Sequence, residues 1–167
     1  MRIEAIDLEF QGTSAGIFVF LVSGSTGRFL VETGPASTSA VLLQALRERG
    51  LEPADLDGAF VTHIHLDHSG AAGHLAREGV PIYVHPRGAK HLVDPSRLIE
   101  GARHVYGESF DALWGETIPA AADNVRIVDD GETVSISGLE ITAIATPGHA
   151  FHHHAYQLGE TLFVGDA

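Results

Sequence analysis

A short apolar segment is followed directly by four side chains of the kind that bind metal ions. They are three histidines and one aspartate, all within six residues. That segment, residues 58–62, is apolar and β-prone, which predicts a short buried strand. Side chains alternate along an extended chain, so His63 and His65 point the same way and can hold one ion. Asp67 and His68 follow where a helix is expected to begin, and a turn there can direct them to a neighbouring ion. Four such side chains rarely cluster without a charge to bind, so the segment predicts a metal site rather than a polar loop.

Two later segments supply further ligands at the ends of expected strands. Residues 139–145 alternate like a strand and run into a Thr-Pro-Gly turn that ends at His149. Residues 161–164 form another short apolar strand, which delivers Asp166 at its tip. Loops at one edge of a sheet are where rigid scaffolds place sites, so we expect these residues to meet the first cluster. Imidazole and carboxylate suit Zn²⁺, Fe²⁺ or Mn²⁺, and with no cysteine the chain offers no thiolate ligand and no disulfide.

Three motifs resemble those of the metallo-β-lactamase superfamily, and they occur in the family's order along almost the whole chain. They are H-x-H-x-D-H at His63, His65, Asp67 and His68, T-P-G-H at Thr146 to His149, and G-D at Gly165-Asp166. The resemblance is closest to the glyoxalase II-like branch and implies an α/β fold, the four-layer αββα sandwich. It also implies a binuclear zinc site, in which His63, His65 and His149 hold a first ion, Asp67 and His68 hold a second, and Asp166 bridges the two.

The chain departs from the family pattern in two places. Members of the family usually continue past the G-D strand and supply a last histidine to the second metal, whereas this sequence stops at Ala167. We therefore expect the amino-terminal half of the sandwich plus part of the second sheet, incomplete at the C-terminus. The second departure is Glu32, which precedes Thr-Gly where the family often has aspartate; we expect it to have a supporting or structural role.

The length of 167 residues corresponds to one domain, and we expect a single domain over residues 1–167. Residues 86–123 predict a helical insertion near the active site. Its aromatic residues, Tyr106, Phe110 and Trp114, are expected to pack against the core in preference to lining a substrate pocket. The remaining patterns predict strands over residues 1–7, 17–23, 28–32, 81–85, 125–128 and 133–137, a helix over 69–76, and a helix over 40–47 that Ser37 or Ser39 caps and Gly50 ends.

Charge and hydropathy narrow the range of partners. The net charge of −12 repels phosphate backbones, so we expect a small-molecule substrate and no nucleic acid. The amino terminus lacks a signal-peptide pattern, and the longest apolar run, residues 16–22, is too short to span a bilayer. We therefore expect a cytoplasmic protein with no membrane role. Part of a sandwich would expose apolar surface, which allows a homodimer.

A metal-dependent hydrolase is the function that these residues predict. Bound zinc lowers the pKa of its water to about 7, so a metal-bound hydroxide can attack an ester, thioester or lactone without a side-chain nucleophile. Asp67 is the predicted catalytic residue, which orients the hydroxide and passes a proton to the leaving group. Thioesterase, lactonase and esterase activities all remain open.

Two alternatives come from other classes. His63, His149 and Asp166 alone would make a two-histidine, one-carboxylate face, as in a mononuclear iron dioxygenase of the persulfide dioxygenase type. The other alternative is a metal-binding but inactive fragment. For the other histidines near the motifs, His85 and residues 152–154, half-exposed strand positions are favoured over contact with the metal or its ligands.

Overall fold

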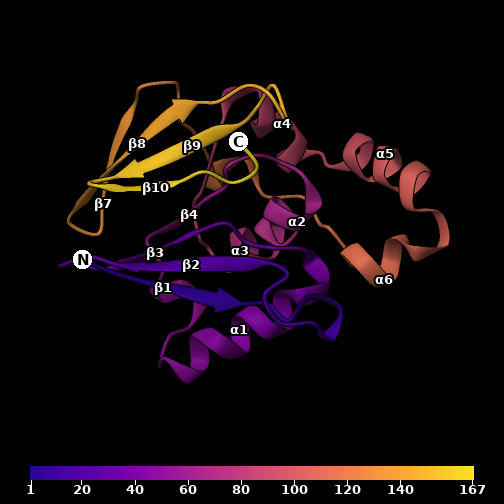
Figure 1. Ribbon diagram of the computed structural model, residues 1–167, viewed down its shortest axis with the longest axis horizontal. Helices are drawn as coiled ribbons and strands as arrows, with labels where there is room; N and C mark the ends of the chain where they lie inside the picture. The colour runs from indigo at the N-terminus through magenta and orange to yellow at the C-terminus, as the bar shows by residue number, and fades with distance from the viewer.

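The computed structural model describes residues 1–167 and arranges the strands in two sheets (Figure 1). The first sheet has the order β1 (Arg2–Asp7), β2 (Phe18–Ser23), β3 (Arg28–Val31), β4 (Gly58–Phe60), β5 (Ile82–Val84) and β6 (Val125–Ile127). The second has the order β10 (Thr161–Phe163), β9 (His154–Leu158), β8 (Leu139–Ala145) and β7 (Thr133–Ile136). The helices are α1 (Ser39–Glu48), α2 (Leu66–Ser69), α3 (Ala72–Arg77), α4 (Pro86–Val93), α5 (Ser96–Tyr106) and α6 (Phe110–Trp114).

The first sheet combines two kinds of pairing. β1, β2 and β3 form an antiparallel meander, whereas β3 through β6 run parallel to one another. Parallel neighbours need crossover connections, and α1 makes one of them while α2 and α3 make the next. All three residues of β4 are buried, as expected of a central parallel strand.

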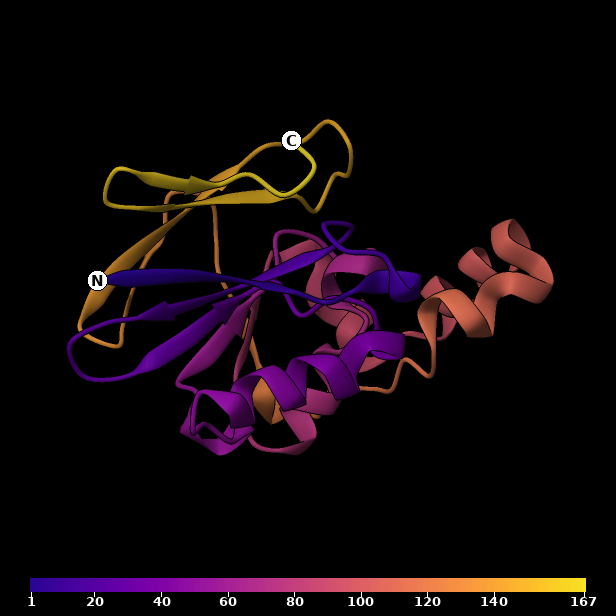
Figure 2. The same cartoon turned by 60° about the horizontal axis from the view of Figure 1, so that its bottom comes forward.

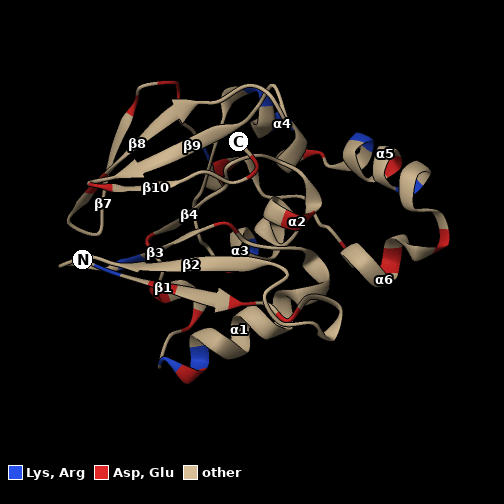
Figure 3. Ribbon diagram, in the orientation of Figure 1, with Lys and Arg blue, Asp and Glu red and all other residues tan.

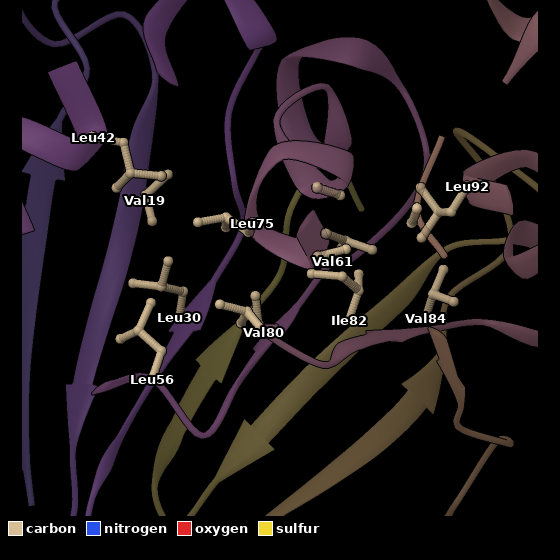
Figure 4. Close-up of a cluster of buried hydrophobic side chains, with 14 of the residues drawn as sticks. Val19, Leu30, Leu42, Leu56, Val61, Leu75, Val80, Ile82, Val84 and Leu92 are labelled. Atoms are coloured by element: carbon tan, nitrogen blue, oxygen red, sulfur yellow. The ribbon is translucent and has the colours of Figure 1, made fainter. Parts of the chain in front are cut away.

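Two apolar cores hold three layers together. One lies between the first sheet and its helices and includes Leu30, Leu42 and Leu75 (Figure 4). The other lies between the two sheets and includes Phe60 and Tyr156, whose rings meet edge to face at 5.2 Å. Figure 2 shows the order of the layers: helices, six-stranded sheet, four-stranded sheet. The predicted α/β fold with two sheets is therefore confirmed, and three of the sandwich's four layers are present.

Local hydrogen bonds correct two details of the predicted helices. Neither Ser37 nor Ser39 caps α1, because the Ser37 hydroxyl donates to the Leu113 carbonyl oxygen and that of Ser39 donates to Ala36. The predicted stop at Gly50 is confirmed, with φ at +70°. The helix predicted over 69–76 is wrong in its extent: α2 and α3 are separate, and the N–H of Ala71 donates to the carbonyl of Gly34 outside the helix.

The segment 86–123 contains α4, α5 and α6, and the last two project to one side of the sheets (Figure 1). Phe110 and Trp114 of α6 pack with Leu66 of α2 in a small apolar cluster that joins the projection to the body. None of the helices combines the length and apolar character needed to cross a membrane.

Candidate metal centre

Strand ends from both sheets meet at one edge of the sandwich. The chain leaves β4 at Phe60 and enters the histidine motif, while the loops after β8 and β10 carry His149 and Asp166. The main-chain N–H of His154 donates to the carbonyl of Thr62 at 2.8 Å, so the two sheets are directly bonded beside the motif. This contact fixes the loops of the second sheet over the end of β4.

Three imidazole nitrogens converge at this edge. His63 Nε2 lies 3.0 Å from His65 Nδ1, and His149 Nε2 lies 2.8 Å from the same atom. Two nitrogens bound at 2.0–2.1 Å to one tetrahedral zinc ion are separated by about 3.3 Å, so the donor atoms are close to coordinating distance. The chemistry of the set, three imidazoles without thiolate, suits zinc.

A second set of donors adjoins the first and contains His63, His68 and Asp166. Asp166 lies between the two sets, since its Oδ1 is 3.2 Å from His68 Nε2 and its Oδ2 is 3.6 Å from His149 Nε2. Asp67 borders this set, with Oδ2 3.5 Å from His68 Nε2. The structure thus brings all six predicted ligand residues together, and the assignment of each to one of two ions remains a prediction.

Glu32 contacts the histidine motif through its buried carboxylate. Its side chain is buried and accepts hydrogen bonds from the hydroxyl and the main-chain N–H of Thr62, and its Oε1 lies 3.2 Å from His68 Nδ1. A carboxylate on the far nitrogen of a ligating histidine fixes the ring's orientation and raises its basicity. The signal in the sequence was an acidic residue directly after a buried strand, at the position where the chain departs from the family pattern.

His153 is a second supporting residue, and its contacts were not predicted. Its Nε2 accepts from the main-chain N–H of Asp166 at 3.2 Å, so the neutral ring carries its proton on Nδ1, which donates to the Thr146 hydroxyl at 2.7 Å. The expectation of half-exposed positions is wrong for His153 and His154, which are 1% and 0% exposed. β9 is an inner strand of the second sheet, and the residues at its start bond to neighbouring segments: His153 accepts from the N–H of Thr146, and His154 donates to Thr62.

The remaining predicted histidines lie apart from the two donor sets. His152 has its ring centroid 5.8 Å from that of His65. His85 caps α4, its Nδ1 accepting from the N–H of Arg87, and its ring lies 4.5 Å from that of His154. Neither belongs to a group of convergent ligand atoms.

Comparison with known families agrees with this arrangement, because residues 13–167 match the profile described as the metallo-beta-lactamase superfamily. The chain belongs to the metallo-β-lactamase superfamily. The motif histidines and the two strand-end loops all fall inside the matched range.

Relatives within the metallo-β-lactamase superfamily include hydrolases. Hydroxyacylglutathione hydrolase of Citrobacter koseri is 29% identical over 150 residues, which are 89% of this chain and 46% of that protein. A metallo-beta-lactamase fold-containing protein, ST1585 of Sulfurisphaera tokodaii, is 30% identical over 67% of this chain and 44% of its own length. The chain thus spans about half the length of these curated relatives.

Solved metallo-β-lactamase structures share the fold. A B3 metallo-β-lactamase with an active-site glutamic acid superposes with a TM-score of 0.70 at 26% identity, covering 96% of this chain and 56% of that one. The family protein TTHA1429 of Thermus thermophilus gives a TM-score of 0.73 at 23% identity, with 93% and 55% covered.

The predicted ligands at this metallo-β-lactamase edge differ in their pKa values. Burial, together with the neighbouring imidazoles, lowers the pKa of His63 far below its ordinary value, and burial also lowers that of His65. These rings are neutral at pH 7 and ready to coordinate. Burial opposes the charged form of His68, but the nearby carboxylates of Asp67 and Glu32 raise its pKa to about 10. His68 therefore carries a proton at pH 7 in the metal-free chain, and it would release this proton on binding a metal.

A groove of about 470 Å³ opens onto the metal edge and is walled by α5 and α6. His65, Asp67, His149 and Asp166 form one side of it. The expectation of core packing is confirmed for Phe110, which is 2% exposed, and wrong for Tyr106, which lines the groove and is 42% exposed. Trp114 does both, because it is largely buried and still borders the groove.

Proposed function

We propose that this chain forms the metal-binding part of a hydrolase that cleaves small-molecule esters, thioesters or lactones. The observation that carries the proposal is the convergence of His63, His65 and His149 beside the Asp166 carboxylate, at the mouth of a groove large enough for a small substrate. The relative named hydroxyacylglutathione hydrolase supports the same reaction class. The net charge of −12 favours a small molecule over a nucleic acid.

The donor set suits zinc, with Fe²⁺ or Mn²⁺ also compatible with imidazole and carboxylate. We assign His63, His65 and His149 to one ion, Asp67 and His68 to a second, and Asp166 to a position between them. Bound zinc would supply hydroxide at neutral pH, because it lowers the pKa of water to about 7.

Asp67 is the residue we assign to proton transfer. It lies at the start of α2 and lines the groove, so it faces both the other donors and an entering substrate. Burial alone would raise its pKa, but the hydrogen bond to His68 and the charge of that ring bring it below the ordinary value. Asp67 is therefore ionised at neutral pH and can accept a proton, which it then donates to the leaving group.

Elemental analysis of the purified protein, together with hydrolysis of a panel of esters, thioesters and lactones, tests the proposal. We expect about two zinc ions per chain and hydrolysis that a chelator abolishes. His149→Ala should lose metal, whereas His104→Ala, which removes an exposed histidine of α5, should not. About one iron per chain with oxygen consumption on a persulfide would instead establish the dioxygenase alternative.

A further inference from the structure

We propose that the groove selects substrates that join an apolar chain or ring to an oxyanionic group, and that Arg97 pairs with the anion. The inference rests on the proposed function, since it names the class of substrate for that site.

The helix α5 turns an apolar stripe toward the groove and buries it only in part, since Leu98 and Ala102 also pack against the cluster of Leu66, Phe110 and Trp114. Leu98, Ala102 and Val105 recur at helical spacing and all line the groove. The helix has no buried residue, and Val105 is 73% exposed. Tyr106 and Trp114 continue this wall, with their rings 5.1 Å apart. An amphipathic helix whose apolar stripe faces a groove leading to the metal edge provides a surface for an apolar substrate group.

Arg97 is the only lysine or arginine that lines the groove. It has no carboxylate within 4.0 Å, whereas Arg103 on the same helix is paired with Asp111 at 2.7 Å. Figure 3 shows basic positions on α5 in blue. Of the acidic side chains of the groove, Asp166 belongs to the second donor set and Asp67 borders it, so both lie at the metal edge. Asp94, just before the helix, interacts with the charge of Arg97 at longer range. A guanidinium without a close partner at an apolar wall suits carboxylate or phosphate, with which its planar fork forms paired hydrogen bonds.

Gly101 leaves room for the ligand between these groups. It lies on the lining face of α5, and a Cβ added there would meet no atom within 4 Å. Glycine inside a helix weakens it relative to alanine. The absence of a side chain in the middle of this wall therefore widens the groove, although it lowers the stability of the helix.

Trp114 is the only tryptophan of the chain, so its fluorescence reports on the groove without any turnover. The test titrates metal-loaded protein with 1-octanesulfonate, a weak zinc ligand, and with 1-octanol and methanesulfonate, which each lack one half of the proposed ligand. We expect saturable binding of octanesulfonate, about tenfold tighter than that of either half. Equal binding of octanol and octanesulfonate would overturn the proposal.

Two pairs of variants locate the binding. Arg97→Gln should weaken octanesulfonate about tenfold, and Arg87→Gln on α4, outside this groove, should not. Gly101→Leu should weaken it by at least tenfold by filling the groove, whereas Gly101→Ala should bind as the wild type does. Unchanged binding in Arg97→Gln or Gly101→Leu would refute the assignment. Repeating the titration with octanoate and octyl phosphate identifies which oxyanion is preferred.

The binding and hydrolysis experiments can each contradict one proposal without contradicting the other. Fluorescence binding without hydrolysis of any ester would refute the proposed reaction and leave the groove assignment standing. Hydrolysis with equal binding of charged and neutral probes would refute the groove assignment and leave the reaction standing.

Discussion

The ring of His153 accepts a hydrogen bond from the main-chain N–H of Asp166 at 3.2 Å. The other ring nitrogen contacts the hydroxyl of Thr146, at the start of the loop that carries His149. One buried imidazole therefore fixes two loops that each contribute a predicted metal ligand.

Replacing His153 by phenylalanine removes both hydrogen bonds while keeping a planar ring. We expect metal affinity to fall by about 10- to 100-fold, the range typical of residues that orient ligands. Competition with a chelator measures this, and His152→Phe, which alters a neighbouring ring without these contacts, is the control. His153→Asn should recover part of the affinity; equal affinity in wild type and His153→Phe would contradict the positioning role.

Gly165 should not tolerate a side chain. Its φ is +50°, and an added Cβ would lie 2.5 Å from Thr62 Oγ1 and 2.8 Å from His153 Nε2. Gly165→Ala is expected to lower the free energy of unfolding by about 1–3 kcal/mol and to weaken metal binding by displacing Asp166. Gly148→Ala is the matched control, because nothing lies within 4 Å of its added Cβ. Urea denaturation with and without zinc separates the two effects, and identical curves for both variants would argue against the tight packing.

His154 should make the metal-free protein sensitive to acid. Burial, with a smaller contribution from the nearby charge of His85, lowers its pKa from 6.5 to about 4, although Asp130 opposes the shift. Between pH 6.5 and 4 the unfolded chain binds a proton that the folded ring does not, so the free energy of unfolding falls as pH falls through this window. The loss from this residue amounts to about 3 kcal/mol by pH 4, and almost none of this dependence remains above about pH 7.5.

His154→Leu tests this dependence. Both ring nitrogens of His154 are buried without a hydrogen-bond partner, so an apolar replacement should be neutral or stabilising at pH 7.5. The variant should lose about 2–3 kcal/mol less than the wild type between pH 7.5 and 4.5, measured by urea denaturation without metal. His104→Leu, at an exposed position, should follow the wild type, and parallel losses in all three proteins would show that His154 does not titrate as described.

Asp67→Asn should nearly abolish turnover of whichever ester the wild type hydrolyses, while the fold is retained. The amide cannot accept the proton, and removal of a proton-transfer group typically costs about 10²- to 10⁴-fold in rate. Circular dichroism reports the fold, and metal content per chain is measured in the same samples, because Asp67 is also a predicted ligand. Turnover within a few-fold of the wild type would exclude Asp67 from proton transfer.

Strands were predictable from local patterns, whereas supporting contacts were not. The alternation of residues 139–145 predicted β8 with its bounds, because one face of that strand meets the inner core and the other does not. The ligand residues could be placed together because each follows a strand end. The error at the start of α1 has the opposite origin: the Ser37 hydroxyl bonds to Leu113, 76 residues away, and no local pattern carries that information.

The supporting role expected for Glu32 agrees with its contacts to Thr62 and His68, but the particular contacts of Glu32 and His153 could not be predicted for the same reason. Glu32 is a buried acid only because β3 lies beside β4 and the motif, and His153 is buried only because the loops after β8 and β10 cover it. Residues 152–154 are three consecutive histidines, yet their surroundings differ: His152 is half-buried, whereas His153 and His154 are buried beside different neighbours. The position of β9 in the fold decides this difference, and the local sequence does not.

The two sheets divide the donors between them, since the histidine motif follows β4 of one and the loops of His149 and Asp166 follow β8 and β10 of the other. An ion bound by both groups would link the two sheets of the sandwich. Because the ion would join the two sheets at that edge, its removal should lower the free energy of unfolding. The hydrogen bond from His154 to Thr62 would still hold the sheets together there.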